Sequence, residues 1–151
     1  MAALLARSII TSAVASVATA SALMLLGRYE RRGALTPLNA SSHWLYGDRD
    51  ARRRRADVAH TGVGVATHHL AVMFWAVLME AALGRWKKRT LPELALGGAL
   101  TAGCAAAFDY LVVPRRLSPG FEHRLRPGSV GLVYLAFCGG LALGAVLSRR
   151  A

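Results

Sequence analysis

Long apolar blocks separated by short polar connections dominate the pattern of the chain. Four blocks, residues 8–27, 58–84, 93–113 and 129–148, are each about 20 residues or longer. A helix of about 20 apolar residues crosses a hydrocarbon core roughly 30 Å thick. The connections, residues 28–57, 85–92 and 114–128, carry most of the charge. The pattern therefore predicts a single membrane domain over residues 1–151 with four transmembrane helices.

Helices fit these blocks better than strands do. No block alternates apolar and polar positions as a lipid-facing barrel strand would, and a helix satisfies its own backbone polar groups inside a bilayer. The five prolines lie outside or at the edges of the blocks, where they end helices without interrupting them. The predicted fold class is all-α, a polytopic integral membrane protein with four helices in a compact bundle.

The first block also has an interpretation as a secretory signal. Arg7 precedes it, and Ala20-Ser21-Ala22 resembles a cleavage site. The apolar run continues through Leu26, which is longer than a usual signal core. We therefore expect the block to be a transmembrane helix.

Small residues recur at four-residue spacing on three of the predicted helices. Such spacing lets helix backbones approach closely in a membrane. We expect tight helix packing, with partners inside the chain or in a second copy. The positions are Ser8, Ser12, Ser16 and Ala20 in the first block, Gly98, Ala102 and Ala106 in the third, and Gly140 and Gly144 in the fourth.

Composition supports a membrane protein. The chain is 54% hydrophobic and 18% charged, whereas about 25% of the residues in soluble domains are charged. This excludes a disordered chain, and two cysteines in apolar blocks do not make a disulfide scaffold. The net charge of +11 is gathered between the blocks, unlike the charge of a soluble nucleic-acid binder.

The basic residues favour one orientation and a contact with lipid. Eight lie in the first connection and four in the third, whereas the other side of the membrane has seven. Because positive residues favour the cytoplasm, the count favours both termini outside. The run Arg52, Arg53, Arg54 and Arg55 lies beside an apolar block, where it is expected to contact anionic lipid headgroups. No aromatic platform accompanies it, so we expect no nucleic-acid partner.

One membrane face collects the candidate functional residues. With four spans, the first and third connections, the start of the second helix and the end of the third all lie on that face. The candidate polar site comprises His43, Asp48, Asp57, His60, His68, His69, Asp109, Glu122 and His123.

The second helix carries two polar stripes. Asp57, His60, Gly64 and His68 share one line at 100° per residue, and His69 and Glu80 share another, rotated by about 120°. Ionisable groups inside a membrane face protein or a water-filled cavity. We therefore expect this helix to be the central one.

Three uses of the histidines remain open. His60, His68 and Asp109 are candidate ligands of a transition metal, and His68 or His69 is a candidate axial ligand of haem. Alternatively, the histidines pass protons or bond to serine, threonine and backbone carbonyls of neighbouring helices. His60 and His68 lack the three- or four-residue spacing that chelates one ion from one helix, so a metal would need ligands from another element.

Three segments of the chain resemble a group of small bacterial inner-membrane proteins of uncharacterised function. The similarity extends from about Arg28 to Leu143 and implies a multi-pass location in the bacterial inner, or cytoplasmic, membrane, but no activity. The segments are residues 37–48 (PLNASSHWLYGD), His68-His69 followed by Phe74-Trp75-Ala76, and residues 108–122, which run from Phe108-Asp109-Tyr110 to Pro119-Gly120-Phe121-Glu122.

The sequence favours a non-enzymatic accessory or structural membrane component. It contains no phosphate-binding loop, HExxH, GxSxG or GxGxxG motif, and no catalytic residue is assigned. The alternatives are a metal- or haem-binding redox or enzyme subunit and an oligomeric transporter or proton-coupled channel. The expected partners are the lipid bilayer and either a second copy of the chain or a membrane partner subunit.

Overall fold

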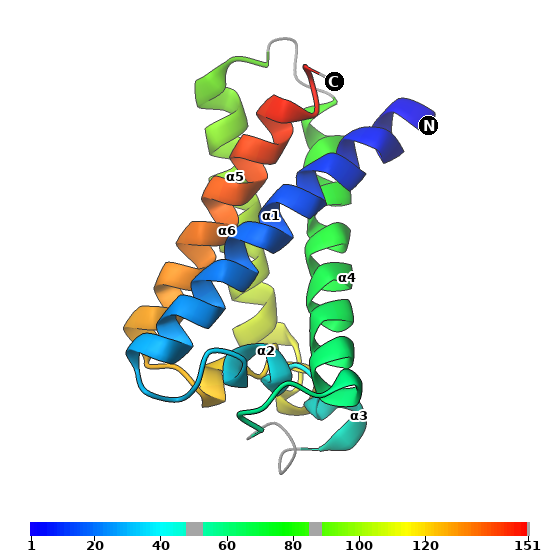
Figure 1. Cartoon of the computed structure of the whole chain (residues 1–151). Coiled ribbons are helices and arrows are strands. Elements are labelled where there is room, and N and C mark those ends of the chain that lie inside the picture. The colour runs from blue at the N-terminus through cyan, green and yellow to red at the C-terminus, as the bar shows by residue number, and fades with distance from the viewer. Residues whose placement is uncertain (48–52, 85–88, 151) are drawn as a thin grey trace. The chain divides into compact units, whose positions relative to one another are not determined.

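A computed structural model of the chain describes residues 1–47, 53–84 and 89–150. Every regular element in these ranges is helical (Figure 1). In chain order they are α1 (Ala2–Tyr29), α2 (Thr36–Ala40), α3 (His43–Tyr46), α4 (Val58–Leu83), α5 (Leu91–Ala107), the π-helix η2 (Phe108–Val112), the 3₁₀-helices η3 (Arg115–Leu117) and η4 (Phe121–His123), and α6 (Pro127–Leu147).

The predicted fold class is confirmed. Four helices within the described ranges are long and apolar enough to cross a membrane: α1, α4, α5 with η2 (Leu91–Val112), and α6. They have 28, 26, 22 and 21 residues. The first starts at Ala2, earlier than expected, and the last starts at Pro127, a residue type suited to a first helical position. These four helices indicate a multi-pass membrane protein.

The chain divides into two compact units, and each long helix contributes residues to both. The first unit comprises Met1–Thr19, His69–Ala106 and Tyr134–Ala151. The second comprises Ala20–His68 and Ala107–Val133.

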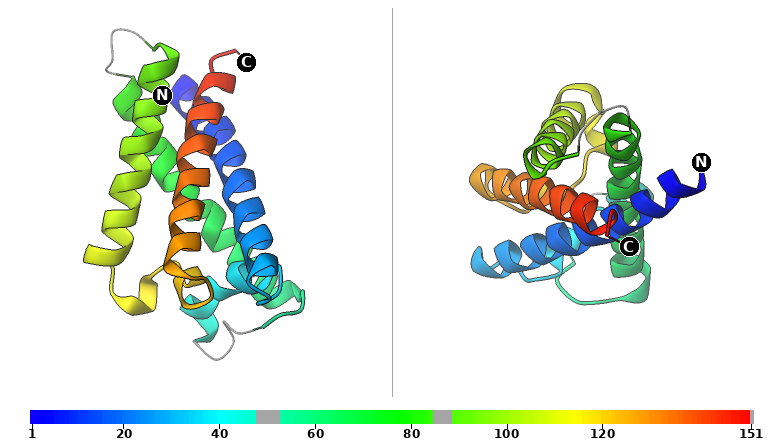
Figure 2. Two further views of the ribbon diagram at one scale, coloured as in Figure 1. Left: turned by 90° about the vertical axis from the view of Figure 1, so that its left-hand side faces the viewer. Right: turned by 90° about the horizontal axis from the view of Figure 1, so that it is seen from above.

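Close backbone contacts between helices build the first unit. A Cβ atom added to Gly144 would lie 2.7 Å from the Cα of Thr11, and one added to Gly140 would lie 2.8 Å from the Cα of Ala15. One added to Gly98 would lie 2.7 Å from the carbonyl oxygen of Cys138. Within this unit α6 accordingly lies between α1 and α5 (Figure 2). The predicted close packing is confirmed, and these partners belong to the same chain.

Apolar side chains fill the remaining space of the first unit. Its core residues share an exposure of 5% or less. The core includes Val72, Ala76, Met79 and Leu83 of α4, Leu94 of α5, and Phe137 and Leu141 of α6. That the second long helix is the central one stays a prediction.

In the second unit, α2 lies directly against α4. A Cβ atom on Gly64 would lie 2.2 Å from the carbonyl oxygen of Leu38, so only glycine permits this approach. The short helices α2 and α3 also pack against η4 and η3. Leu38, Phe121 and Leu125 are each at most 6% exposed. The glycine in the first predicted stripe thus forms a packing contact.

Replacing Gly64 should therefore show whether overpacking against α2 or the higher helix propensity of alanine has the larger effect on stability. Gly64→Ala is expected to lower the stability of the protein by about 1–3 kcal/mol, because overpacking displaces α2. Gly62→Ala is the matched control, since its added Cβ meets nothing within 4 Å and alanine favours a helix by about 1 kcal/mol. Thermal unfolding in mild detergent measures both. Equal changes in the two variants would contradict the contact.

Candidate functional site

The start of α4 joins two of the predicted site residues. An Asp57 Oδ1 oxygen accepts a hydrogen bond from the backbone N–H of His60 at 2.7 Å, the usual geometry of a helix N-cap. The same carboxylate meets the ring Nδ1 of His60 at 2.9 Å and the guanidinium of Arg53 at 3.2 Å. The backbone hydrogen bond from His60, followed by the one from its ring, lowers the pKa of Asp57 below its usual value.

His60 is enclosed by the first connection. It is 7% exposed, and its ring centroid lies 4.5 Å from that of Tyr46. One ring nitrogen faces Asp57 of the same helix. The predicted stripe is thus partly covered by α2 and α3, which bring Leu38 against Gly64 and Tyr46 against His60.

A buried asparagine, whose contacts the sequence did not predict, ties the first connection to α4. Asn39 has no exposed surface. Its amide nitrogen donates to the carbonyls of Arg53 and Arg55, each at 3.1 Å, and its amide oxygen accepts from the Thr61 hydroxyl at 2.8 Å. Two of the bonds satisfy carbonyls of the segment that leads into α4, and the third joins Asn39 to Thr61 of α4 itself.

His43 is buried against the third connection. It is 3% exposed, and its Nδ1 lies 2.7 Å from the carbonyl oxygen of Ala40. Because a carbonyl only accepts, Nδ1 donates this hydrogen bond. Gly120, at φ +88°, packs onto this pair; a Cβ there would lie 2.6 Å from His43 Nδ1. The His43 Nε2 atom is buried and has no hydrogen-bond partner in the described structure.

Polar contacts join the first and third connections into what we call the connection cap, residues 36–46 and 118–123. The Ser41 hydroxyl donates to the carbonyl of Pro119, and the Trp44 indole donates to the carbonyl of Ser118, both at 2.9 Å. The Ser118 hydroxyl donates to Glu122, whose carboxylate lies 3.6 Å from Nε2 of His123. His43 and Glu122, predicted to share a membrane face, thus belong to one packed element.

Glu30 was also missed. Its carboxylate accepts the Ser129 hydroxyl at 2.5 Å and the backbone N–H of Arg126 at 3.1 Å. It therefore lies at the N-terminus of α6, where a negative charge is stabilised by the helix dipole.

A charged cluster is buried in the first unit. Glu80 of α4 has no exposed surface and receives two bonds from the Arg149 guanidinium, at 3.2 and 2.8 Å. The Thr11 hydroxyl donates to it at 2.9 Å, and Arg7 Nε lies 3.5 Å away. The sequence did flag Glu80 but not its partners. A signal exists, because in a four-span chain the start of the first helix and the ends of the second and fourth share one face.

The other predicted residues have separate positions. In the first unit, His69 bonds through Nδ1 to the Ser16 hydroxyl of α1 at 2.8 Å, the kind of bond expected of a packing histidine. In the second unit, Asp109 is partly buried in η2, and His68 lies on α4. Asp48 lies outside the described residues.

Part of the arginine run serves the protein itself. Arg54 donates from Nε to the carbonyl of Arg32 at 2.8 Å, near the end of α1, and Arg53 pairs with Asp57. Arg55 is exposed, and Arg52 lies outside the described residues. Lipid-headgroup contact by Arg52–Arg55 stays a prediction.

The site geometry does not assemble a metal centre from the described parts of the chain. In residues 1–47, 53–84 and 89–150, no group of three or more His, Cys, Asp or Glu side chains is placed to hold a metal ion. Comparison of the chain with protein-family profiles, curated proteins and solved structures gives no match. The resemblance to small bacterial inner-membrane proteins therefore stays an expectation.

The buried carboxylate gives a quantitative prediction. Glu80→Ala is expected to cost about 3–5 kcal/mol, because it leaves the largely buried Arg149 side chain, 16% exposed, without its counter-charge. The double variant Glu80→Leu with Arg149→Met should recover most of the loss. Arg116→Met, which removes an exposed guanidinium, should change stability by about 0.5 kcal/mol or less. Thermal unfolding of the four proteins in one detergent measures this. A double variant no more stable than Glu80→Ala would refute the pair.

The Asp57 cap predicts a pH dependence. Its folded-state pKa lies below the usual value of 3.8, so as the pH falls the unfolded chain takes up the proton first. The stabilisation by the charged cap is therefore complete above this range and is lost as the pH falls from about 3.8 through the lowered pKa. Asp57→Asn, which keeps a capping oxygen without a titrating charge, should unfold earlier than the parent at pH 7 but close to it at pH 2.5. Parallel pH profiles for the two proteins would contradict this role.

Proposed function

We propose that the chain is a non-enzymatic structural or accessory component of a bacterial inner membrane. The observation that carries the proposal is that its buried polar residues form hydrogen bonds and ion pairs within the chain. Glu80, His69 and Asn39, which would be costly inside a membrane or a packed connection, bond to groups of the same chain. Such residues fix the positions of helices and connections.

The connection cap supports the same role. Its serine and tryptophan side chains bond to carbonyls of the opposite connection, and Gly120 permits a close approach to His43. A packed cap offers a fixed surface to a partner subunit. A transporter or channel instead needs elements that move apart to admit a substrate.

Metal or haem binding by the histidines of α4 is the alternative to be tested. His60 faces Asp57 and His69 faces Ser16 through one ring nitrogen each. Such bonds also orient the imidazoles of metal sites, so the contacts alone do not distinguish the two roles. A chemical measurement does.

The test is elemental analysis and a visible absorption spectrum of the protein purified in mild detergent without a histidine tag. We expect less than about 0.1 metal ion per chain, because no group of three or more ligating side chains is assembled among the described residues. The structural proposal also expects no Soret band. His68→Ala and His60→Ala should then match the parent in both measurements. A stoichiometric metal or a Soret band that disappears in His68→Ala would replace the structural proposal with the cofactor one.

A further inference from the structure

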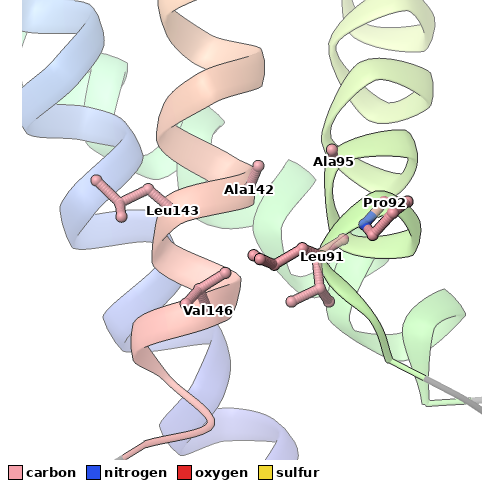
Figure 3. A pocket seen from close by; sticks show the side chains of 7 residues that line it. Leu91, Pro92, Ala95, Ala142, Leu143 and Val146 are labelled. Atoms are coloured by element: carbon pink, nitrogen blue, oxygen red, sulfur yellow. The ribbon is translucent and has the colours of Figure 1, made fainter.

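An open apolar groove separates the first turns of α5 from the last turns of α6. Its volume is about 460 Å³, within the roughly 300–1,000 Å³ of small-molecule sites. Figure 3 shows Leu91, Pro92 and Ala95 on one side and Ala142, Leu143 and Val146 on the other. With Leu94, these residues define the α5–α6 groove. Every one of them is apolar, and all belong to the first unit.

The surroundings of the groove determine what fills it. Both helices are long and apolar enough to span a membrane, so an open apolar groove between them faces hydrocarbon chains. Leu91 and Leu143 are 69% and 53% exposed, whereas Leu94 is 3% exposed and forms the floor. The groove is therefore a surface feature that an acyl chain enters from the side.

Basic residues lie at the ends of the two helices beside the groove. Arg89 lies two residues before the start of α5, and Arg150 follows the end of α6; both are exposed. Glu93, the acidic residue of this region, is held at the start of α5 by the backbone N–H and hydroxyl of Thr90, at 2.7 and 3.0 Å. Arg89 also donates to the carbonyl of Gly84 at 3.5 Å. Arg89 and Arg150 together outweigh the one carboxylate of Glu93, so these three side chains leave a net positive charge at this end of the groove.

We propose that the α5–α6 groove binds one acyl chain of an anionic phospholipid whose headgroup contacts Arg89 and Arg150. A second copy of the chain fits less well. A symmetric pair joined through this groove would bring the same two arginines of both copies together, and like charges in an interface oppose association. An anionic headgroup instead complements them.

The test is a titration of the detergent-solubilised protein with phosphatidylglycerol or with phosphatidylcholine of the same acyl chains, followed by native mass spectrometry. We expect one phosphatidylglycerol to bind at least 10-fold tighter than phosphatidylcholine. A basic residue near an anionic surface contributes about a 5-fold change in affinity. Arg89→Gln and Arg150→Gln should each lose about 5-fold and the double variant about 25-fold. The double variant Arg28→Gln with Arg116→Gln, which removes two exposed arginines elsewhere, should bind as the parent does.

A second pair of variants tests the groove itself. Ala95→Phe fills the groove and should abolish the tight phosphatidylglycerol site, whereas Ala99→Phe, at an exposed α5 position outside the lining, should not. Unfolding temperatures equal to that of the parent establish that the variants fold. Equal affinity for the two lipids, or tight binding that persists in Ala95→Phe, overturns the proposal. So does a dimer that Ala95→Phe dissociates, because a second copy would then be the occupant.

Discussion

A buried carboxylate that must find its counter-charge inside the protein is the constraint on which the first unit depends. Glu80 has no exposed surface, and an uncompensated charge in such a place costs several kcal/mol. Its partners come from α1 and α6, so these helices must approach α4 and each other closely. Gly144 permits this, because the α1 backbone at Thr11 lies where its side chain would be. The Thr11 hydroxyl then bonds to Glu80, so one residue serves both the close packing and the buried charge.

In the second unit, short helices and turns supply the bonding partners that its buried polar groups need. Its buried polar residues include Asn39, Ser42 and His43, and a buried backbone carbonyl without a partner costs about as much as a lost hydrogen bond. Asn39 and Trp44 satisfy carbonyls of distant segments. Glycines again set the distances: Gly64 admits the carbonyl of Leu38, and Gly120 admits the imidazole of His43. Close backbone contact and side-chain bonds to carbonyls together hold the connections in place.

The spans were predictable because their length and lack of charge are local properties. The close packing of Gly98, Gly140 and Gly144 was predictable because the spacing of small residues along a helix is also a local property. For the candidate site, the residues were predictable, but their contacts and burial were not. Helical periodicity placed Asp57 and His60 on one line, but it could not show that they bond to each other or that the first connection covers them. The contacts of Asn39 and Glu30 were not predictable, because their partners lie elsewhere in the chain and sequence spacing does not bring them together.

The contacts of the arginines indicate that anionic lipid should bind at particular places on this basic chain rather than over its whole surface. A net charge of +11 suggests broad attraction to anionic lipid, yet several arginines are used within the protein. Arg149 neutralises Glu80, Arg53 pairs with Asp57, and Arg54 bonds to the carbonyl of Arg32. A guanidinium held in this way donates fewer bonds to a headgroup. An arginine contributes most to lipid selectivity where it is exposed beside an apolar surface that also binds the acyl chain, since both parts of one lipid are then held together.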